Sequence, residues 1–288
     1  MKISIIDIGS NSVRLATFAD GKTLYKLIQT TRLGEGLAKT GYLTDAAIER
    51  TALQVEKFYR QTLEEGAEKV YAFSTAPARA AANGKDFVKK VYELCGLEVD
   101  VISGVTEAEI GLLGALGTAD GGMIDLGGAS TEVTVRVDGK RVYAKSADIG
   151  AVRLYDACGR DRAKLEKMIA DKLPYYGDFT AEKYDMYGVS GTATTLAALK
   201  HGLKEYDGAV VQGTKLSAEE VECYAYDLLN TPVEEISKML TVDSRRADII
   251  GGGALLLARL IQKLKIKSIT VSDSDNLEGY YMLKEMAK

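Results

Sequence analysis

The sequence predicts an α/β protein with two similar halves. Each half has an antiparallel three-stranded meander followed by alternating helices and strands, in the order βββαβαβ. Two observations predict this class. The segment "IIDIGSN" at residues 5–11 is echoed by "MIDLGGAS" at residues 123–130, and strand and helix patterns alternate after both segments. The length of 288 residues is also consistent with about two domains.

The echo keeps one constant spacing over about twenty positions, which is typical of a duplicated structural unit. Asp125 follows Asp7 by 118 positions. The Asp-Gly pair at residues 138–139 follows the pair at 20–21 by the same interval. Asp-Gly between alternating apolar runs indicates a β-hairpin, so each copy is expected to contribute three antiparallel strands.

In the first half, Thr44 or Asp45 can cap a helix that continues to about residue 65 with apolar residues at helical spacing. "KVYAFST" then predicts a strand. "NGKDFVKKVYELCG" predicts a helix that glycine closes, and "LEVDVIS" and "TEAEIGLLGAL" predict a further strand and helix. The first domain is therefore expected to span residues 1–118.

The second half repeats this alternation after its meander. Its predicted elements are helices near 150–172, the strand "YGVS", a helix opening at "GTATTLAAL", helices over about 217–240 and about 245–264, the strand "IKSITVS" and a terminal helix. We expect the second domain to span residues 119–275 and the terminal helix, residues 276–288, to return to the first domain.

Composition excludes several functional classes. The net charge of −4 gives no electrostatic footprint for general nucleic-acid binding. No apolar run is long enough for a membrane span, and His201 is the only histidine, so a histidine-rich metal site is excluded. The three cysteines are widely spaced, which indicates a reduced, cytoplasmic protein.

A glycine turn directly follows the first strand of each meander. Such a turn exposes several backbone N–H groups, and glycine lets a ligand approach them, so it suits an anion such as phosphate. Neighbouring hydroxyl groups would add donors. The candidate phosphate-binding residues of the two turns are Ser10, Ser12, Gly127, Gly128, Ser130 and Thr131.

The aspartates that precede these turns, Asp7 and Asp125, are unsuited to holding phosphate directly. Their oxygen atoms suit Mg²⁺, which binds carboxylates and usually keeps several waters. We therefore expect Mg²⁺ as the cofactor and both aspartates as candidate metal ligands. A purely structural role as turn caps is the alternative.

A third turn lies in "YGVSGTATTLAAL". Ser190, Gly191 and Thr192 open a helix there, and a helix N-terminus can bind an anion. Gly191 and Thr192 are therefore further candidates for phosphate binding, unless Ser190 or Thr192 merely caps the helix. The sequence has neither a G-x-G-x-x-G motif nor a P-loop.

These features together resemble a known superfamily, that of actin, sugar kinases and Hsp70. Within it the chain closely resembles the short, two-domain form of the exopolyphosphatase and guanosine-pentaphosphate phosphatase (Ppx/GppA) family. The matching segments are "IDIGSNSVRL", "RLGEGLAKTGYL", "STAPARAAANGKDF", "VISGVTEAEIGLLGAL", "IDLGGASTEV", "VSGTATTLAAL" and "RRADIIGGGALLL". The resemblance implies two ribonuclease-H-like (actin-like) domains around an interdomain cleft.

The resemblance also implies Mg²⁺-dependent hydrolysis of terminal phosphoanhydride bonds in inorganic polyphosphate, or of guanosine pentaphosphate. By position in the matching motifs, Glu107 is the catalytic glutamate, and Asp125 and Glu132 are the metal-linked acids. The implied phosphate contacts are Asn11, Arg79 and Asn83. Such a protein needs no membrane and no nucleic acid, and a homodimer is left open.

Three positions depart from the family pattern. Thr106 replaces an acid beside the catalytic glutamate, Ala129 replaces a glycine of the second turn, and Leu277 stands where the family often has arginine. These departures motivate a second hypothesis, a nucleotide- or ppGpp-binding regulatory protein with little hydrolysis. A small-molecule kinase is a third, for which no acceptor pocket is evident. The choice between polyphosphate and pppGpp, and any chain-length preference, stay open.

Overall fold

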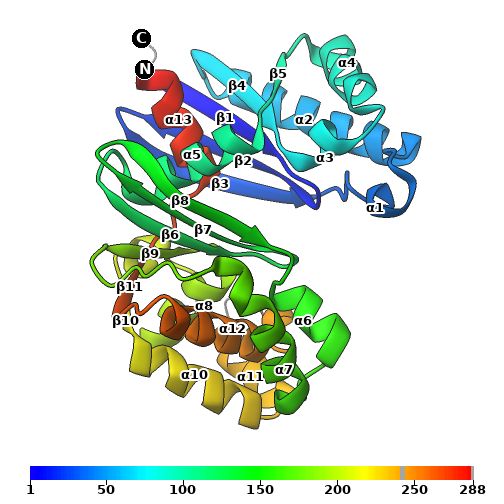
Figure 1. The fold of residues 1–288 in the computed structure, drawn as a ribbon. Helices are drawn as coiled ribbons and strands as arrows, with labels where there is room; N and C mark the ends of the chain where they lie inside the picture. Colours follow the sequence, from blue (N-terminus) through cyan, green and yellow to red (C-terminus); the bar gives the residue numbers. More distant parts are fainter. Residues whose placement is uncertain (241–243, 287–288) are drawn as a thin grey trace. The chain divides into compact units, whose positions relative to one another are not determined.

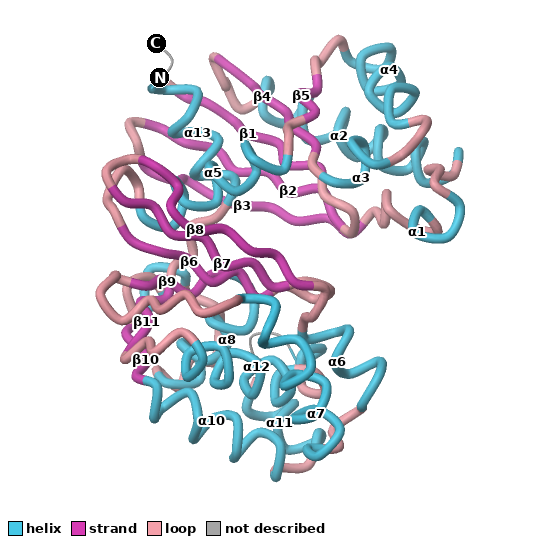
Figure 2. Tube along the Cα trace, viewed as in Figure 1, coloured by secondary structure: helices cyan, strands magenta, loops and turns pink. Residues whose placement is uncertain are grey.

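The computed structural model describes residues 1–240 and 244–286, which form two compact units (Figures 1 and 2). Unit 1 comprises Met1–Gly114 and Asn276–Lys288, and unit 2 comprises Ala115–Asp275. The second unit thus begins slightly before the predicted start at residue 119. The terminal helix belongs to the first unit.

Unit 1 contains a five-stranded sheet in the order β3-β2-β1-β4-β5. The first three strands form an antiparallel meander, and β4 and β5 run parallel to β1. The elements are β1 (Lys2–Ile8), β2 (Ser12–Ala19), β3 (Lys22–Thr30), α1 (Leu37–Thr40), α2 (Asp45–Glu64), β4 (Lys69–Ser74), α3 (Ala76–Ala80), α4 (Gly84–Cys95), β5 (Val99–Val101), α5 (Gly104–Leu116) and α13 (Asn276–Met286).

Unit 2 repeats this order with one added edge strand, giving β10-β11-β9-β6-β7-β8. The meander is antiparallel, β9 runs parallel to β6, and β11 runs parallel to β9. The elements are β6 (Gly121–Leu126), β7 (Thr131–Val137), β8 (Lys140–Ala147), α6 (Ala151–Cys158), α7 (Arg162–Lys172), η1 (Leu173–Tyr176), β9 (Met186–Val189), α8 (Ser190–Lys200), α9 (Gly208–Val211), β10 (Lys215–Ser217), α10 (Ala218–Asn230), α11 (Val233–Met239), η2 (Ser244–Arg246), α12 (Ile250–Lys263) and β11 (Ser268–Val271).

The predicted duplication is confirmed in detail. Both Asp-Gly hairpin turns have positive φ at both central residues, 50° and 79° in the first copy and 52° and 69° in the second. This is the conformation of a type I′ turn. The strand register also shifts at equivalent places, between Thr17 and Phe18 and between Val135 and Arg136. The two meanders therefore share their irregularities as well as their strands.

The sheet of unit 1 is covered on both faces, which explains the continuous apolar run of β1. Ile6 and Ile8 pack in the cluster that includes Val55 of α2 and Phe87 of α4. The alternate residues of β1 pack on the opposite face in a cluster with residues of α5 and α13. Figure 1 shows α13 and α5 on one side of this sheet and α2 and α4 on the other.

Unit 2 has one large apolar cluster between its sheet and its helices. β6 and β7 contribute Ile124, Leu126, Val133 and Val135 from one face. Helix α12 is buried along almost its whole length and packs against α6, α7, α8 and α10. Because side chains alternate along a strand, the remaining residues of β6 and β7 project to the opposite face of the sheet.

Helix α13 docks on unit 1 through close contact with α5. A Cβ atom added at Gly279 would lie 1.6 Å from the carbonyl oxygen of Ile110 and 2.9 Å from the amide nitrogen of Gly114. The rings of Tyr280 and Tyr281 stack on Phe73 and Phe18, with ring centroids 4.4 Å and 4.3 Å apart. Only glycine at position 279 allows this approach of the two helix backbones.

Gly279→Ala is therefore expected to lower the free energy of unfolding by about 1–3 kcal/mol, the usual cost of forcing extra volume into a packed core. Urea unfolding followed by circular dichroism measures this change. Gly252→Ala in α12 is the matched control, because a Cβ there meets nothing closer than 3.5 Å. Helix propensity should make the control neutral or slightly stabilising. Equal stability of the two variants would contradict the assigned packing.

Candidate functional site

The candidate residues of each unit lie at the carboxyl ends of its parallel strands. In unit 1 the turn at residues 9–12 follows β1, α3 follows β4, and α5 follows β5. In unit 2 the turn at residues 127–130 follows β6, and α8 follows β9. In open α/β sheets, ligands bind at the carboxyl ends of the strands. The topology therefore gathers the predicted site residues of each unit at one edge of its sheet.

The second glycine turn (residues 127–130) is held by the N-terminus of α6. The carbonyl oxygen of Gly127 accepts from the amide of Ala151 at 3.0 Å, and that of Gly128 accepts from Val152 at 2.9 Å. Gly150 permits this approach, since a Cβ there would lie 2.6 Å from the carbonyl oxygen of Gly128. The carbonyl groups of the turn therefore point toward α6.

This anchoring fixes the direction of the amide groups. In a planar trans peptide the N–H group points opposite to the C=O group. The carbonyl of Ala129 is also held, by the Nε atom of Arg153 at 2.9 Å. The N–H groups of Gly128, Ala129 and Ser130 therefore point away from α6, in a row that suits an anion. Because the donors are main-chain groups, Ala129 retains the amide that a glycine would offer at this position.

The first glycine turn (residues 9–12) has the same construction. Its closing bond, from the amide of Gly9 to the carbonyl of Ser12, measures 3.0 Å, as does its counterpart from Gly127 to Ser130. The carbonyl of Ser10 accepts from the amide of Gly34 at 2.8 Å, and the backbone after β3 holds the carbonyl of Asn11. The amides of Asn11 and Ser12 consequently point away from that backbone.

A row of acidic and hydroxyl side chains crosses the sheet of unit 2 beside its turn. Asp125 on β6 is paired with Glu132 on β7, which is paired with Ser146 on β8. The Ser146 hydroxyl donates to Glu132 at 2.5 Å, and the Ser190 hydroxyl donates to Asp125. Directly opposed like charges are unfavourable in a sheet, so this pair of carboxylates favours a bound cation.

The equivalent row in unit 1 is chemically different. Asp7 is paired with Arg14, and Arg14 is paired with Ile28. The Nε atom of Arg14 donates to the Asp7 carboxylate at 3.0 Å, and the Asp7 side chain is only 4% exposed. Arg14 thus supplies the positive charge beside Asp7. A metal-binding role for Asp7 stays a prediction, and the donor set of unit 2 fits a cation better.

Two carboxylates of unit 2 could hold a cation such as Mg²⁺. Asp125 and Glu132 supply two carboxylates, and no group of three or more His, Cys, Asp or Glu side chains suited to a metal occurs within residues 1–240 and 244–286. A fully protein-made cage, as Ca²⁺ often has, is therefore missing from this described part. Mg²⁺ usually binds through one or two carboxylates and completes its shell with water and phosphate oxygens.

In unit 1, Glu107 and Arg79 form an ion pair at the same edge of the sheet as the first turn. Glu107 lies in the first turn of α5, and its carboxylate is 3.1 Å from the Nη1 atom of Arg79 on α3. The same Nη1 atom donates to the carbonyl of Ile102 at 2.8 Å. Both side chains are about one-third exposed, at 35% for Arg79 and 31% for Glu107. Each can therefore reach a ligand from a held position.

The third turn is strained and carries an arginine that the sequence analysis missed. Ser190 has a φ of 68°, which is uncommon outside glycine and is found preferentially at functional sites. The guanidinium of Arg246 in η2 lies directly against Gly191, where an added Cβ would be 1.5 Å from Nη1. The only signal in the sequence was the "RRAD" segment, whose role no spacing rule defines. Arg246 gives this helix N-terminus a positive charge suited to phosphate.

Three of the predicted phosphate contacts instead have bonds or packing inside their own unit. The Thr131 hydroxyl is fully buried and donates to the carbonyl of Ile149 at 2.6 Å. The Asn83 amide bonds both the N–H and the C=O of Leu43, each at 2.9 Å. Thr192 is buried and packs near Gly253. We therefore expect these side chains to support the turns without touching phosphate.

Comparison with known proteins identifies the group to which this arrangement belongs. The model of the Ppx/GppA phosphatase family matches residues 15–286, nearly the whole chain. The chain belongs to the Ppx/GppA phosphatase family. The Ppx/GppA family member of Aquifex aeolicus has the same fold, with a TM-score of 0.87 and 28% identity over 100% of this chain and 98% of that one. The two units are therefore actin-like domains, as predicted.

Among curated relatives, exopolyphosphatase 2 of Mycobacterium tuberculosis is 29% identical over 96% of this chain and 97% of its own length. A bifunctional 3-dehydroquinate synthase/phosphatase of Fusobacterium nucleatum is 30% identical over 95% of this chain. A guanosine-5'-triphosphate,3'-diphosphate pyrophosphatase of Photobacterium profundum is 28% identical over 98% of this chain. The chain spans only 45% and 59% of the last two proteins.

Two of the departures from the Ppx/GppA pattern have structural roles. The Ser103 hydroxyl caps α5 by accepting from the Thr106 amide at 3.1 Å, and the Thr106 hydroxyl lies 3.0 Å from this cap. Leu277 is buried in the apolar cluster of unit 1 with Ile5 and Phe18. Neither change removes Glu107 or Arg79 from the edge of the sheet. The departures therefore give no structural reason for lost hydrolysis.

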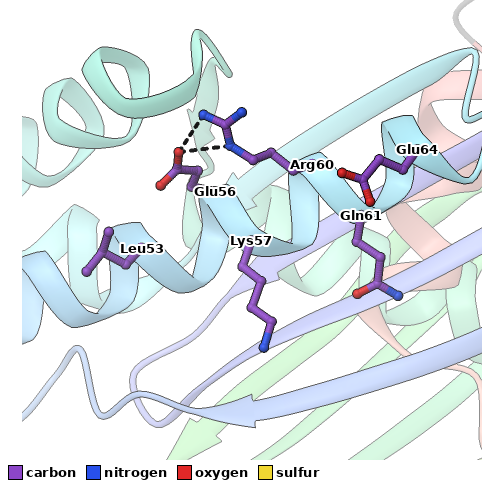
Figure 3. A pocket seen from close by; sticks show the side chains of 6 residues that line it. All are labelled: Leu53, Glu56, Lys57, Arg60, Gln61 and Glu64. Atoms are coloured by element: carbon purple, nitrogen blue, oxygen red, sulfur yellow. Dashed lines mark hydrogen bonds and ion pairs between the residues drawn. The ribbon is translucent and has the colours of Figure 1, made fainter.

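A separate surface depression lies on α2 and is unrelated to these residues. Its lining consists of Leu53, Glu56, Lys57, Arg60, Gln61 and Glu64 (Figure 3). Figure 3 shows Glu56 and Arg60 joined, and their carboxylate and guanidinium are 2.8 Å apart. The depression contains none of the candidate residues.

In the described part of the chain, no helix is both long and apolar enough to cross a membrane.

Gly191→Ala is expected to weaken binding of tripolyphosphate about tenfold or more, equivalent to about 1.4 kcal/mol. The added methyl group would displace the Arg246 guanidinium, whereas the flexible arginine side chain leaves the fold intact. Isothermal titration calorimetry measures the affinity. Arg246→Ala should have a similar effect, and the double variant should be no weaker than either single one, because both changes remove the same contact. Additive losses would contradict this coupling.

Proposed function

We propose that this protein is an exopolyphosphatase. It hydrolyses the terminal phosphoanhydride bond of inorganic polyphosphate, releases orthophosphate, and also converts pppGpp to ppGpp. The observation that carries the proposal is the second turn, where three successive amides point outward beside the Asp125–Glu132 pair. This arrangement suits a polyanion with a divalent cation. Relatives named exopolyphosphatase and guanosine-5'-triphosphate,3'-diphosphate pyrophosphatase support the substrate class.

The proposed role of Glu107 is that of general base. In the hydrolysis, a water oxygen attacks the terminal phosphorus, the bond to the bridging oxygen breaks, and Glu107 accepts a proton from the water. Such a base contributes typically 10²–10⁴-fold to the rate. The adjacent Arg79 holds the carboxylate at 3.1 Å and can also donate to a phosphate oxygen. Arg79 would thereby place Glu107 close to the terminal phosphate group.

The turns and Arg246 would hold the phosphate groups through backbone amides and one guanidinium. When bound, Mg²⁺ would neutralise phosphate charge. Asp125 and Glu132 are the proposed ligands, with the Ser190 and Ser146 hydroxyls orienting them. Phosphoryl transfer depends mainly on positioning and charge stabilisation, and these residues supply both.

Two finer predictions complete the proposal. A cytoplasmic location and a homodimer stay predictions. Neither bears on the chemistry of Glu107 and Asp125 within their own units.

Glu107→Gln should lower kcat at least 100-fold, because the amide cannot accept the proton of the attacking water. Release of orthophosphate from polyphosphate, tripolyphosphate and pppGpp measures the effect. Glu109→Gln, two positions along the same helix on the exposed surface, is the matched control and should retain activity. An active Glu107→Gln variant would exclude Glu107 as the base. Tight binding of pppGpp by an inactive wild-type protein would favour the regulatory hypothesis instead.

Removal of divalent cations with EDTA should abolish phosphate release, and Mg²⁺ should restore it. Asp125→Asn and Glu132→Gln should each raise the Mg²⁺ concentration for half-maximal activity by about tenfold or more, since each removes a ligand charge. Asp7→Asn tests whether the Asp7–Arg14 row of unit 1 differs from the Asp125–Glu132 row of unit 2 in binding the cation. An unchanged Mg²⁺ requirement would agree with its pairing to Arg14, and an equal rise would show that Asp7 also binds the cation.

A further inference from the structure

The carbonyl groups of the two glycine turns are anchored by different chemistry at one position. Asn11 in the first turn and Ala129 in the second are equivalent, 118 positions apart. The Asn11 carbonyl accepts two backbone amides, from Thr31 at 2.9 Å and from Arg32 at 2.8 Å. The Ala129 carbonyl accepts a side chain instead, the Nε atom of Arg153 at 2.9 Å.

One neighbouring anchor is the same in the two turns. The amide of Gly34 holds the Ser10 carbonyl at 2.8 Å, and the amide of Val152 holds the Gly128 carbonyl at 2.9 Å. These pairs are also separated by 118 positions. At the next carbonyl, the one before the last amide of the turn, the donor differs between the two copies.

One of the two backbone donors of the first turn is not available to the Ala129 carbonyl in the second copy. The position equivalent to Thr31 is Ile149, whose amide donates to the carbonyl of Ala147 at 2.7 Å. That amide is therefore engaged elsewhere. The side chain of Arg153, on the first turn of α6, reaches back to Ala129 and supplies a donor to the carbonyl.

The bond to Arg153 controls the direction of one particular donor. The Ala129 carbonyl and the Ser130 amide belong to the same planar peptide, so the two groups point in opposite directions. Holding the carbonyl toward α6 keeps the Ser130 N–H turned outward. The turn is exposed at Gly128 and Ala129, so little packing opposes a rotation of this peptide.

We propose that Arg153 is a positioning residue for phosphate binding. It holds the Ala129 carbonyl and thereby presents the Ser130 amide to the substrate without touching the substrate itself. This inference rests on the proposed phosphohydrolase function, because it assigns the second turn to phosphate. Arg153 lies outside the turn, on helix α6, and would contribute to catalysis through the turn.

The test is a series of substitutions at position 153 assayed for phosphate release from tripolyphosphate. Arg153→Ala should lower kcat/KM about 10–100-fold, somewhat less than the loss of a donor itself, which typically costs 10²–10³-fold. Arg153→Gln keeps a neutral N–H donor and should retain more activity than Arg153→Ala. Exogenous guanidinium chloride at millimolar concentration should partly restore Arg153→Ala, because the Arg153 side chain is exposed and its place is open to a small cation.

Matched controls separate this role from charge and from stability. Arg162→Ala removes another arginine of unit 2, on α7, which pairs with Glu166 and lies over Tyr226. It should leave kcat/KM unchanged and should not respond to guanidinium. All variants should unfold at the same temperature as the wild type. A stability loss in Arg153→Ala that accounts for its lost activity would overturn the positioning role.

The dependence of KM on salt concentration distinguishes positioning from direct contact. If Arg153 touched phosphate, Arg153→Ala and Arg153→Gln would be equally impaired, and KM would become less sensitive to potassium chloride. That result would overturn the inference, as would full activity of Arg153→Ala. A wild-type protein that releases no phosphate would instead refute the proposed function, and tripolyphosphate binding by calorimetry would then still test the effect of Arg153 on the turn.

Discussion

The anchoring of turn carbonyls is the interaction on which the rest of the site depends. At the end of β6, the N-terminal amides of α6 and the side chain of Arg153 bind three successive carbonyl groups. Because each peptide is planar, every anchored carbonyl turns the next amide outward. A phosphate group can then be bound without a dedicated basic side chain in the turn. The position of the turn follows from the parallel strands, whose carboxyl ends lie along one edge of the sheet.

Duplication gave the two units one scaffold, and substitution then gave them different chemistry. Equivalent positions hold Asp7 with Arg14 in unit 1 and Asp125 with Glu132 in unit 2. The first pair joins a carboxylate to a guanidinium, whereas the second places two carboxylates opposite each other. The proposed division of labour follows directly. Unit 1 carries the proposed base, Glu107, and unit 2 carries the proposed metal site.

The sequence predicted the elements of the site better than the function of individual side chains. The spacing of the echo located both turns, and the family resemblance located Glu107, which the structure places beside Arg79. Thr131 and Asn83 were predicted to contact phosphate, but their side chains bond the backbone inside their units. The residue type in a motif does not show whether its hydroxyl or amide group faces a ligand or the core. Arg246 was missed for the converse reason, because its partner, Gly191, lies far away in the chain.

The sequence by itself determined the two βββαβαβ units, the hairpins between their strands, the glycine turns and the family, since these depend on local patterns of apolar residues, glycine and aspartate. Only the tertiary structure decided which backbone groups of each turn face outward and that Arg246 packs against Gly191. Those outcomes depend on contacts between segments distant in the chain, such as the hydrogen bond from Arg153 to Ala129 and the packing of Arg246 against Gly191. Local patterns fix where a strand ends, but the direction of a peptide is set by the partner that binds its carbonyl.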